Sequence, residues 1–585
     1  MTAPLLACPK QTRCPGCPLG AESYETGLAR KGRSLQAALS AYPSLQPELS
    51  EPRPASPTLH YRLRAKLVSH GRALGLFERG SHHVLDVAGC RVLSPSLTRA
   101  SEALRRLLPL PIHGADLRET SEGVLVTLLT EQSASHPELE HAARQLVDEG
   151  AAVSVAIARR RDGDVRLLSG EPEVVVGTTT ARHALAPNAP YAYAAHGGFV
   201  QAHAEQASYV YAELGRGLVE KLPHLAQPAV LELFAGNGSL ALALSRTGAR
   251  VTAVEAYAPA IQLAERAARE QSLSLRAVAG DATRFMHTGS GERFDAVIVN
   301  PPRRGLDADL RRAIAGAEPR VLAYVSCNPH TLARDAWHLQ RLGLNLERTE
   351  PLDMIPWSDA VEVLAWFAPH PPAAPRVLRE DDDFLAVEKG PHEAVQAAAN
   401  APSLTARVRR LPGCAEALAI DAWGDGVSGV CWFAKHPPAL DRWRQASARE
   451  ERSLLVLARG NLRKQGTITR RGPAGNEPGS RYKKQRDLGR HSLLVVTNGD
   501  LGEAPTLRDF ASISHPVLGA PHDGDHASNQ FLEHRHGLDR SFVHCLSSRL
   551  RVGPEQELHA ESELSPDLAR VVASLGSDQT ARQGD

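Results

Sequence analysis

The chain has 585 residues, of which 42% are hydrophobic and 23% are charged, a composition typical of packed globular proteins and not of disordered chains. At roughly 150 residues per domain, this length predicts about four domains. No run of 18 apolar residues occurs, so we expect no transmembrane helix. The 67 Lys and Arg residues balance the 66 Asp and Glu residues, and the net charge of +1 argues by itself against a dedicated polyanion binder.

The amino-terminal segment carries closely spaced cysteines and no signal peptide. Eight cysteines in 585 residues are too few for a disulfide scaffold, which favours a reducing compartment. Because no signal-peptide pattern is present either, we expect an unprocessed cytoplasmic protein. Cys8, Cys14 and Cys17 lie in a Pro- and Gly-rich loop with the spacing C-x5-C-x2-C, which is more typical of metal ligands than of disulfides. Cys90 is the only other cysteine before Cys327, which makes it the candidate fourth ligand. Thiolate coordination suits zinc or an iron–sulfur cluster, and the spacing does not separate them.

From about residue 55 to 175, apolar and polar residues alternate between frequent turns. This period of two predicts strands, and within them it places Arg62, Arg64 and Lys66 on one face. A row of cations on a sheet can bind the phosphates of a nucleic acid. The alternative is a solvated face, and the sequence favours neither interpretation.

The segment from about 228 to 367 alternates apolar strand-like runs with helical stretches. The runs cover residues 229–234, 250–255, 296–300 and 321–326. Strand–helix–strand repetition of this kind predicts a parallel, doubly wound α/β sheet.

The turn after the first of these runs has features of a nucleotide pocket. Phe234 is followed by Gly236 and Gly238, and such glycines let the backbone and the amino terminus of the next helix approach a ligand. No third glycine follows at dinucleotide spacing, which disfavours NAD. Glu255 ends the second run and can accept hydrogen bonds from two ribose hydroxyls, while Asp281 in the next loop can contact an adenine amino group. Together they favour S-adenosylmethionine, and the alternative is an ordinary turn with two solvated carboxylates.

A cysteine directly after the fourth run is the candidate nucleophile. Cys327 lies where doubly wound sheets bind ligands and just before a predicted helix, which favours the thiolate. Glu362 follows residues 353–357, in a segment that begins after a strand-like run and can return to the same edge of the sheet. This pair fits attack of sulfur at C6 of a uracil, methylation at C5, and removal of the C5 proton by Glu362. The alternative is a structural cysteine, which behaves as a small hydrophobe.

Residues 8–367 resemble the RNA uracil-C5 methyltransferases, most closely the branch that acts on 23S ribosomal RNA without an amino-terminal TRAM domain. The matching segments are the four-cysteine pattern, Tyr61-Arg62 with Lys66, Gly198-Phe199-Val200-Gln201, Leu233-Phe234-Ala235-Gly236, Val254-Glu255, Asn300-Pro301-Pro302-Arg303-Arg304-Gly305, Ser326-Cys327-Asn328-Pro329 and Asp353-Met354-Ile355-Pro356. The chain departs from the family at Ala235, where a cysteine is usual, and at residues 357–360, where a His-Thr-x-His run is usual.

The resemblance implies a role for three sets of residues. It implies that a [4Fe-4S] cluster, with zinc as the alternative, is held by Cys8, Cys14, Cys17 and Cys90. It implies that the pocket for S-adenosylmethionine is lined by Gln201, Phe234, Glu255 and Asn300. It also implies that Cys327 is the nucleophile and Glu362 the base.

The carboxy-terminal part resembles the large-subunit-type pseudouridine synthases at residues 377–389, 428–430 and 513–519. In that family an aspartate four residues before the Ser-Gly pair attacks the nucleoside, whereas here Gly424 stands at that position. Asp421 and Asp425 are out of register, so we predict a non-catalytic module. Nine cations between residues 463 and 490 face two acidic residues, which indicates RNA binding or, alternatively, a solvated flexible loop.

These observations predict a Rossmann-like methyltransferase domain with a β-rich RNA-binding insertion and a carboxy-terminal α+β domain. The expected segments are a cysteine-rich segment with a lead-in helix (1–54), a β-rich domain that supplies Cys90 (55–180), the methyltransferase domain (181–368), a Pro-rich linker (369–375), the pseudouridine-synthase-like domain (376–555) and a polar, frayed tail (556–585).

The predicted function is methylation of C5 of a uridine in RNA, with 23S rRNA favoured over tRNA. We expect no membrane and no obligate protein partner. The rival interpretations are a catalytically silent rRNA-binding or assembly factor and a bifunctional methyltransferase and pseudouridine synthase.

Overall fold

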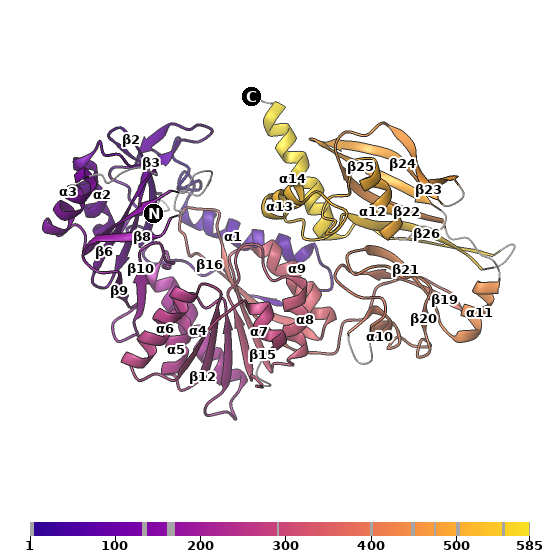
Figure 1. Ribbon diagram of the computed structural model, residues 1–585. Coiled ribbons are helices and arrows are strands. Elements are labelled where there is room, and N and C mark those ends of the chain that lie inside the picture. The colour runs from indigo at the N-terminus through magenta and orange to yellow at the C-terminus, as the bar shows by residue number, and fades with distance from the viewer. Residues whose placement is uncertain are drawn as a thin grey trace. The chain divides into compact units, whose positions relative to one another are not determined.

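The computed structural model describes residues 5–131, 137–160, 170–288, 292–397, 402–445, 451–472, 475–498, 503–552 and 556–583. The chain divides into two compact units (Figure 1). The N-terminal unit comprises Met1–Ala333 and Asn345–Pro369, and the C-terminal unit comprises Arg334–Leu344 and His370–Asp585. Among the described residues, no helix is long and apolar enough to cross a membrane.

An eight-stranded sheet forms the core of the N-terminal unit, with the order β1-β16-β17-β15-β14-β11-β12-β13. Its strands are β1 (Glu48–Leu49), β11 (Ala229–Leu233), β12 (Arg250–Glu255), β13 (Leu275–Ala279), β14 (Ala296–Val299), β15 (Val321–Ser326), β16 (Leu344–Leu352) and β17 (Glu362–Pro369). The neighbouring strands β15, β14, β11, β12 and β13 run parallel to one another, and β17 pairs antiparallel with β15. Every residue of β11, β14 and β15 is buried, as expected for strands covered on both faces. The predicted doubly wound α/β sheet is therefore confirmed.

Helices connect these strands. They are α4 (Ala204–Lys221), α5 (Ser239–Arg246), α6 (Ala258–Glu270), α7 (Ala282–Thr288), α8 (Ala308–Gly316) and α9 (Pro329–Arg341). Figure 1 shows α4 to α8 flanking the sheet. Apolar side chains of α4 and α5, such as Leu214 and Leu244, pack with Ile298 of β14 in one buried cluster. This packing holds the strands in place, so the loops at their ends are carried by a rigid support.

A second sheet of the N-terminal unit has seven strands in the order β4-β3-β2-β5-β6-β7-β8. The strands are β2 (Arg64–His70), β3 (Ala73–Phe77), β4 (Val84–Asp86), β5 (Gly114–Thr120), β6 (Gly123–Thr130), β7 (Ser154–Arg159) and β8 (Pro172–Val176). The remaining elements of the unit are α1 (Tyr24–Ser40), α2 (Pro95–Leu107), α3 (Pro137–Asp148) and the hairpin β9 (Thr180–His183) and β10 (Ala192–Ala195). The strands expected from the alternating pattern are present, with α2 and α3 between them.

The C-terminal unit contains a ten-stranded, mostly antiparallel sheet with the path β18-β19-β21-β26-β22-β25-β24-β23. Its strands are β18 (Val377–Glu380), β19 (Phe384–Lys389), β20 (Leu418–Ala419), β21 (Ser428–Ala434), β22 (Glu451–Arg459), β23 (Gln465–Gly472), β24 (Gly475–Leu488), β25 (His491–Asn498), β26 (Val543–Arg551) and β27 (Glu557–Glu561). Its helices are α10 (Leu404–Val408), α11 (Pro437–Gln445), α12 (Glu503–Ser512), α13 (His526–His536) and α14 (Pro566–Gln583). This is an α+β arrangement, as predicted.

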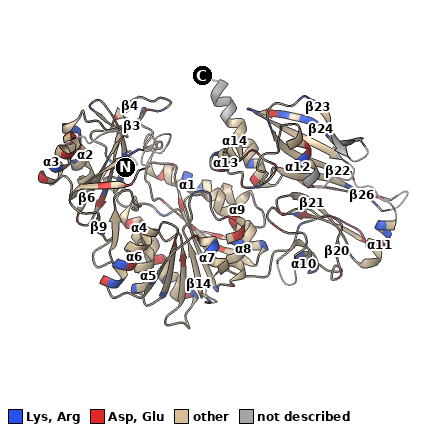
Figure 2. Cartoon of the chain, viewed as in Figure 1, with Lys and Arg blue, Asp and Glu red and all other residues tan. Residues whose placement is uncertain are grey.

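One expectation for the C-terminal unit is wrong. The tail expected to be frayed contains β27 and α14, because Leu568, Val571 and Leu575 form a helical stripe that is buried in a core cluster. The cationic stretch, for which the sequence indicated RNA binding or, alternatively, a solvated flexible loop, contains the antiparallel pair β23 and β24 (Figure 2). Arg463, Lys464, Arg481, Lys483, Arg486 and Arg490 are exposed there, whereas the side chains of Arg470 and Arg471 lie outside the described residues.

Candidate active site

The carboxyl ends of the central parallel strands bring four of the predicted site residues to one edge of the sheet. Phe234 follows β11, Glu255 ends β12, Asn300 follows β14 and Cys327 follows β15. These strands are neighbours in the sheet, so the loops after them meet. Ligands of open α/β sheets bind outside this edge.

The turn after β11 has an unusual backbone. Phe234 has a φ of +64°, which is costly for a bulky residue and is found where a site over-determines the conformation. Gly236 and Gly238 have φ values of +58° and +73°. A Cβ at Gly236 would meet no atom within 4 Å, whereas one at Gly238 would lie 2.4 Å from the Cβ of Ala264. Gly236 therefore leaves open space for a ligand, and Gly238 allows the close packing of α5 against α6.

The carboxylate of Glu255 holds this turn. Its Oε2 accepts a hydrogen bond from the amide of Gly236 at 3.0 Å, and its Oε1 accepts one from the amide of Tyr257 at 2.9 Å. Asp281 caps α7, since its Oδ1 accepts a hydrogen bond from the amide of Arg284 at 2.9 Å. Each carboxylate oxygen keeps a second lone pair, so the predicted contacts with ribose and adenine stay predictions that the local hydrogen bonds permit.

Two residues that the sequence analysis missed lie behind this pocket. Glu232 of β11 is only 2% exposed. Burial raises its pKa to about 8, although a hydrogen bond from the amide of Ala241 acts to lower that pKa. Tyr211 of α4 forms a hydrogen bond with the side chain of Gln201, and burial and the nearby charges of Glu232 and Glu362 raise its pKa. Gln201 is thus joined to the site through Tyr211. A carboxylate within an apolar strand was a signal for Glu232, whereas nothing in the sequence marked Tyr211.

The predicted nucleophile and base lie on adjacent antiparallel strands. Ser326 of β15 pairs with Val363 of β17, so the register places the next residues, Cys327 and Glu362, opposite each other. Burial is the largest cause that raises the pKa of the Cys327 thiol, and the charge of Glu362 raises it further. Arg303 lowers that pKa through its charge and a side-chain hydrogen bond. The structure therefore brings the thiol, the carboxyl group and a guanidinium together.

Arg303 joins both members of this pair. Burial raises the pKa of Glu362 to about 7, and the charge of Arg303 opposes that rise. The Arg303 carbonyl oxygen accepts hydrogen bonds from Asn328 Nδ2 at 3.1 Å and from Thr331 Oγ1 at 3.3 Å. This connection fixes the loop after β14 against the loop after Cys327. The position of Arg303 three residues after Asn300 was the signal that could have identified it as a site residue.

The loop that leads to Glu362 is fastened to the amino-terminal segment. Lys31 and Asp353 form an ion pair with side chains 3% and 1% exposed, and the Tyr24 hydroxyl donates to Asp353 Oδ2 at 2.8 Å. Trp357 is buried with a φ of +67°, and its Nε1 donates to the carbonyl oxygen of Thr58 at 2.8 Å. These bonds hold the segment that precedes β17, and Glu362 is the first residue of that strand.

The four candidate metal ligands lie near one another. Cys8, Cys14, Cys17 and Cys90 are half-buried, and the other three thiols all contribute to raising the pKa of Cys17 to about 12, after burial as the largest cause. Arg62 opposes that shift. Among the described residues, however, no group of three or more His, Cys, Asp or Glu side chains is arranged to hold a metal ion. The metal centre therefore stays a prediction.

The predicted row of cations is not uniform. Arg62 precedes β2 and its Nε donates to the carbonyl oxygen of Arg64, whose own side chain lies 3.8 Å from Asp116. Asp116 also pairs with Arg118, and neither of these side chains is exposed. Only Lys66 of the three predicted cations is exposed, and burial lowers its pKa. The sheet face is thus partly an internal ion-pair network, and RNA binding by the three cations stays a prediction.

In the C-terminal unit, the position of the missing nucleophile is filled by a different residue. A Cβ added at Gly424 would lie 2.2 Å from Oε2 of Glu503. Asp421 is buried, pairs with Arg452 and accepts a hydrogen bond from the amide of Trp432 at 2.6 Å, so it is fully engaged elsewhere. Asp421 therefore does not take the place of the family's aspartate.

Comparisons with known proteins give the family of the chain. The methyltransferase small domain family matches residues 202–318, and the tRNA (uracil-5-)-methyltransferase family matches residues 289–368. A 23S rRNA (uracil(1939)-C(5))-methyltransferase of Pseudomonas putida is 30% identical over 380 residues, which cover 62% of this chain and 79% of that protein.

Two solved structures are also similar. The tRNA (uracil-54, C5)-methyltransferase of Pyrococcus abyssi, solved with S-adenosyl-L-homocysteine, has a TM-score of 0.50 at 22% identity and covers 61% of this chain and 86% of its own. The human RNA pseudouridylate synthase domain containing 1 has a TM-score of 0.27 at 15% identity and covers 32% of this chain and 83% of its own. With the first structure sharing its fold and the Pseudomonas putida enzyme sharing its sequence over most of that enzyme's length, the chain belongs to the RNA uracil-C5 methyltransferase family.

Proposed function

We propose that this protein transfers a methyl group from S-adenosylmethionine to C5 of a uridine in 23S rRNA, through a covalent bond between Cys327 and C6 of the base. The observation that carries the proposal is the placement of Cys327 opposite Glu362, with Arg303 acting on both, at the edge of the sheet where the Phe234 turn opens. A substrate base bound there has the thiol and the carboxyl group within one site.

The chemistry assigns one step to each side chain. The Cys327 thiolate attacks C6 of uracil, the S–C6 bond forms, and the electron pair of the C5–C6 double bond moves into an enolate. S-adenosylmethionine would supply the electrophilic methyl group: the C5–CH3 bond forms as the S–CH3 bond of the donor breaks, and S-adenosylhomocysteine is the leaving group. Glu362 then removes the proton from C5, the double bond re-forms, and the S–C6 bond breaks to return the thiolate.

The electrostatics of the site suit this sequence of steps. Burial alone would keep Cys327 protonated, whereas the guanidinium of Arg303 favours the thiolate, as does the start of α9 two residues later. A carboxyl group with a pKa of about 7 can exchange a proton near neutral pH. Glu255 and the turn from Phe234 to Gly238 orient the methyl donor.

The test uses RNA in which fluorine replaces the C5 hydrogen of uridine. After methylation, Glu362 has no proton to remove, so Cys327 stays bonded to C6 and a stable protein–RNA adduct runs on a denaturing gel. We expect the adduct with 23S transcript and S-adenosylmethionine, and none with Cys327→Ala. Methylation of ordinary RNA without any adduct on fluorinated RNA contradicts the covalent route, and a tRNA transcript in the same assay distinguishes the two RNA substrates.

Cys8, Cys14, Cys17 and Cys90 are proposed to hold a [4Fe-4S] cluster. The support is the all-sulfur donor set, which suits iron–sulfur clusters, and the interaction of the four thiols with one another. Protein purified without oxygen is expected to absorb visible light and to contain iron and sulfide, and Cys14→Ser is expected to lose all three signals. Colourless protein that contains zinc contradicts the cluster.

The C-terminal unit is proposed to assist RNA binding without chemistry of its own. The support is the absence of a side chain at Gly424 and the exposed cations of β24 and of the segments just before β23 and just after β24. A silent assembly factor is the rival for the whole chain, and it predicts RNA binding with no methyl transfer. The proposed reaction on rRNA agrees with the expected location in the cytoplasm.

A further inference from the structure

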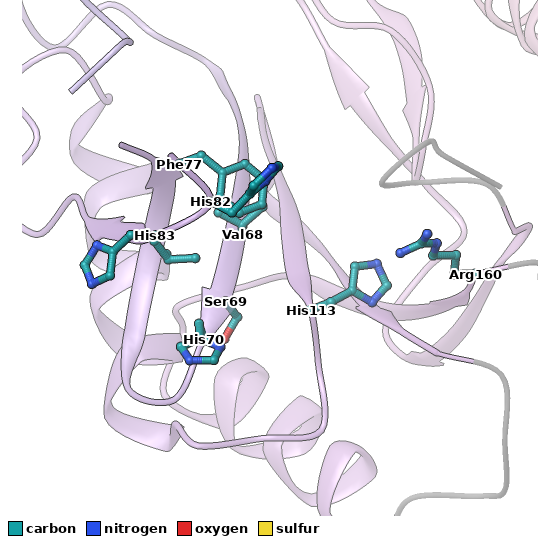
Figure 3. Close-up of a pocket in the computed structure, with 9 residues that line it drawn as sticks. Val68, Ser69, His70, Phe77, His82, His83, His113 and Arg160 are labelled. Atoms are coloured by element: carbon teal, nitrogen blue, oxygen red, sulfur yellow. The ribbon is translucent and has the colours of Figure 1, made fainter. Parts of the chain in front are cut away.

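A pocket of about 290 Å³ opens in the seven-stranded sheet of the N-terminal unit (Figure 3). Its polar lining includes His70, His82, His83, His113 and Arg160, and Phe77 supplies an aromatic ring. None of the described residues that line it carries a carboxylate. The volume is close to the lower end of the range for small-molecule pockets, which fits a ligand of the size of one nucleotide.

The walls of the pocket come from one end of the sheet. His70 ends β2, His113 directly precedes β5, and Arg160 directly follows β7. The backbone between them is hydrogen-bonded across strands: Ser69 N donates to the His113 oxygen at 2.9 Å, and Arg160 N donates to the Thr130 oxygen at 2.9 Å. A pocket built from strand ends tied in this way is held in shape before a ligand arrives.

Its rim presents aromatic rings to solvent. Phe77 is 46% exposed, a large fraction for a phenylalanine. Its ring meets the ring of His82 edge to face, with centroids 5.8 Å apart and an angle of 81°, and Figure 3 shows the two together. Exposed rings in a donor-rich surface are the platforms on which proteins stack unpaired bases, independently of base identity.

The charges around the pocket favour an anion. Among the described residues, the carboxylate of Glu78 lies 3.5 Å from Nδ1 of the lining residue His83. That carboxylate is engaged by two hydrogen bonds from Arg13, at 2.5 and 3.0 Å, so its negative charge is balanced. Arg160 and the imidazoles then present donors, which suit the oxygens of a phosphate.

A metal ion is a poorer occupant for the histidines. Imidazole clusters bind zinc and related ions when three or four nitrogens converge. Within the described part of the chain, no three His, Cys, Asp or Glu side chains are arranged to hold such an ion. The histidines of the pocket are therefore spread around it rather than gathered on one point.

The strand that carries the predicted cations leads to this pocket. In β2 the side chains of Arg64, Lys66 and His70 fall on the same face by the period of two, and His70 lines the pocket. We propose that this pocket binds one unpaired nucleotide of the RNA substrate, with the base against Phe77 and His82 and the phosphate at Arg160. This inference rests on the proposed function only in taking RNA as the ligand, and it adds a second contact away from the reacting uridine.

The test measures RNA binding separately from methyl transfer. Binding of a labelled 23S transcript is measured on the Cys327→Ala protein, which cannot turn over, with and without Phe77→Leu. Leucine keeps an apolar side chain but removes the ring, and we expect the Kd to rise about ten-fold, the loss typical of one stacked base. In the otherwise wild-type enzyme, the same substitution raises KM about ten-fold and leaves kcat unchanged. Val219→Ala, at an exposed residue of α4, is the matched control.

The phosphate contact has its own signature. The logarithm of the binding constant falls linearly with the logarithm of the salt concentration, and Arg160→Gln is expected to make this slope less negative by about 0.7 to 0.9, the value for one lost phosphate contact. Arg99→Gln, on the exposed face of α2, is expected to leave the slope unchanged. Ultraviolet cross-linking of the bound transcript places a nucleotide on the peptide that contains Phe77 and His82. Unchanged Kd and salt slope in both pocket variants, or cross-links only on other peptides, overturn the proposal.

The two proposals fail in different ways. If the wild type binds RNA through Phe77 but transfers no methyl group, the proposed function fails and the pocket stands. If methyl transfer proceeds and Phe77→Leu changes neither Kd nor KM, the pocket fails and the proposed function stands.

Discussion

The two units of this protein differ at the position where their resemblances place a nucleophile. In the N-terminal unit, Cys327 follows β15 and the register of β17 places Glu362 opposite it. In the C-terminal unit, Gly424 has no side chain, and the carboxyl group of Glu503 occupies the adjacent space. Both units have intact, well-buried cores. A well-packed core is therefore no evidence for a reaction, because a reaction depends on a few side chains at one site.

The largest expected effect is at the nucleophile. Cys327→Ala is expected to lower methyl transfer by at least about 10⁴-fold, since no other group can form the bond to C6. Cys327→Ser tests whether an oxygen nucleophile of the same shape can substitute. Methyl transfer by Cys327→Ala within ten-fold of the wild type would contradict the assignment of a nucleophile to the N-terminal unit. A thermal unfolding curve like that of the wild type is the control that the variant is folded.

The next effect is at the base. Glu362→Gln is expected to slow turnover about 10² to 10⁴-fold and to accumulate the covalent adduct on ordinary RNA, because the C5 proton stays in place. Since the pKa of Glu362 is raised to about 7, the carboxyl group is protonated and inactive below that value. The rate of the wild type should therefore rise as the pH increases through about 7, and rise further at higher pH as Cys327, whose pKa is raised, forms more thiolate. Arg303→Lys, which keeps a positive charge, is the comparison variant, and a flat pH profile with no adduct in Glu362→Gln contradicts this role.

A smaller effect is expected at the ion pair that holds the loop before Glu362. Lys31→Met leaves Asp353 buried without its partner, and the loss of such a partner costs about 3 to 5 kcal/mol in the free energy of unfolding. Replacing both residues, as Lys31→Met with Asp353→Leu, should restore much of that stability. Chemical denaturation measures the stability, while kcat reports the placement of Glu362. Full stability in Lys31→Met shows that the pair does not hold the loop.

The sequence predicted the parts of the site that depend on strand order. Apolar runs of strand length, separated by helical stretches, indicated which residues lie at the carboxyl ends of strands, so Phe234, Glu255 and Cys327 were predicted at one edge of the sheet, whereas Asn300 was assigned to the site through the family resemblance. Contacts that depend on long-range packing left no periodic signal. Tyr211 lies on a helix with an ordinary pattern.

The carboxy-terminal helix shows the opposite failure. Its few apolar residues are separated by polar ones, so the sequence predicted a polar tail, although three of its apolar side chains are buried in a core cluster. Average composition hides a narrow helical stripe. The hydrophobic face of a helix at the end of a chain is visible only when positions are compared at helical spacing.

The smallest expected effect, that of Gly424→Asp, tests the difference between the two units most directly. Gly424→Asp restores a carboxylate at the position of the pseudouridine-synthase nucleophile, but its Cβ falls 2.2 Å from Oε2 of Glu503, so two carboxyl groups compete for one space. Glu503 can move because the contact involves the far end of a flexible side chain, and we expect a loss of only about 1 kcal/mol in stability. We expect no pseudouridine in RNA treated with Gly424→Asp in the Cys327→Ala background, and none when Glu503→Ala is added to clear the space. Pseudouridine from the Gly424→Asp variant would show that the C-terminal unit lost only one side chain, whereas its absence after Glu503→Ala shows that the surrounding groups have also diverged from a catalytic arrangement.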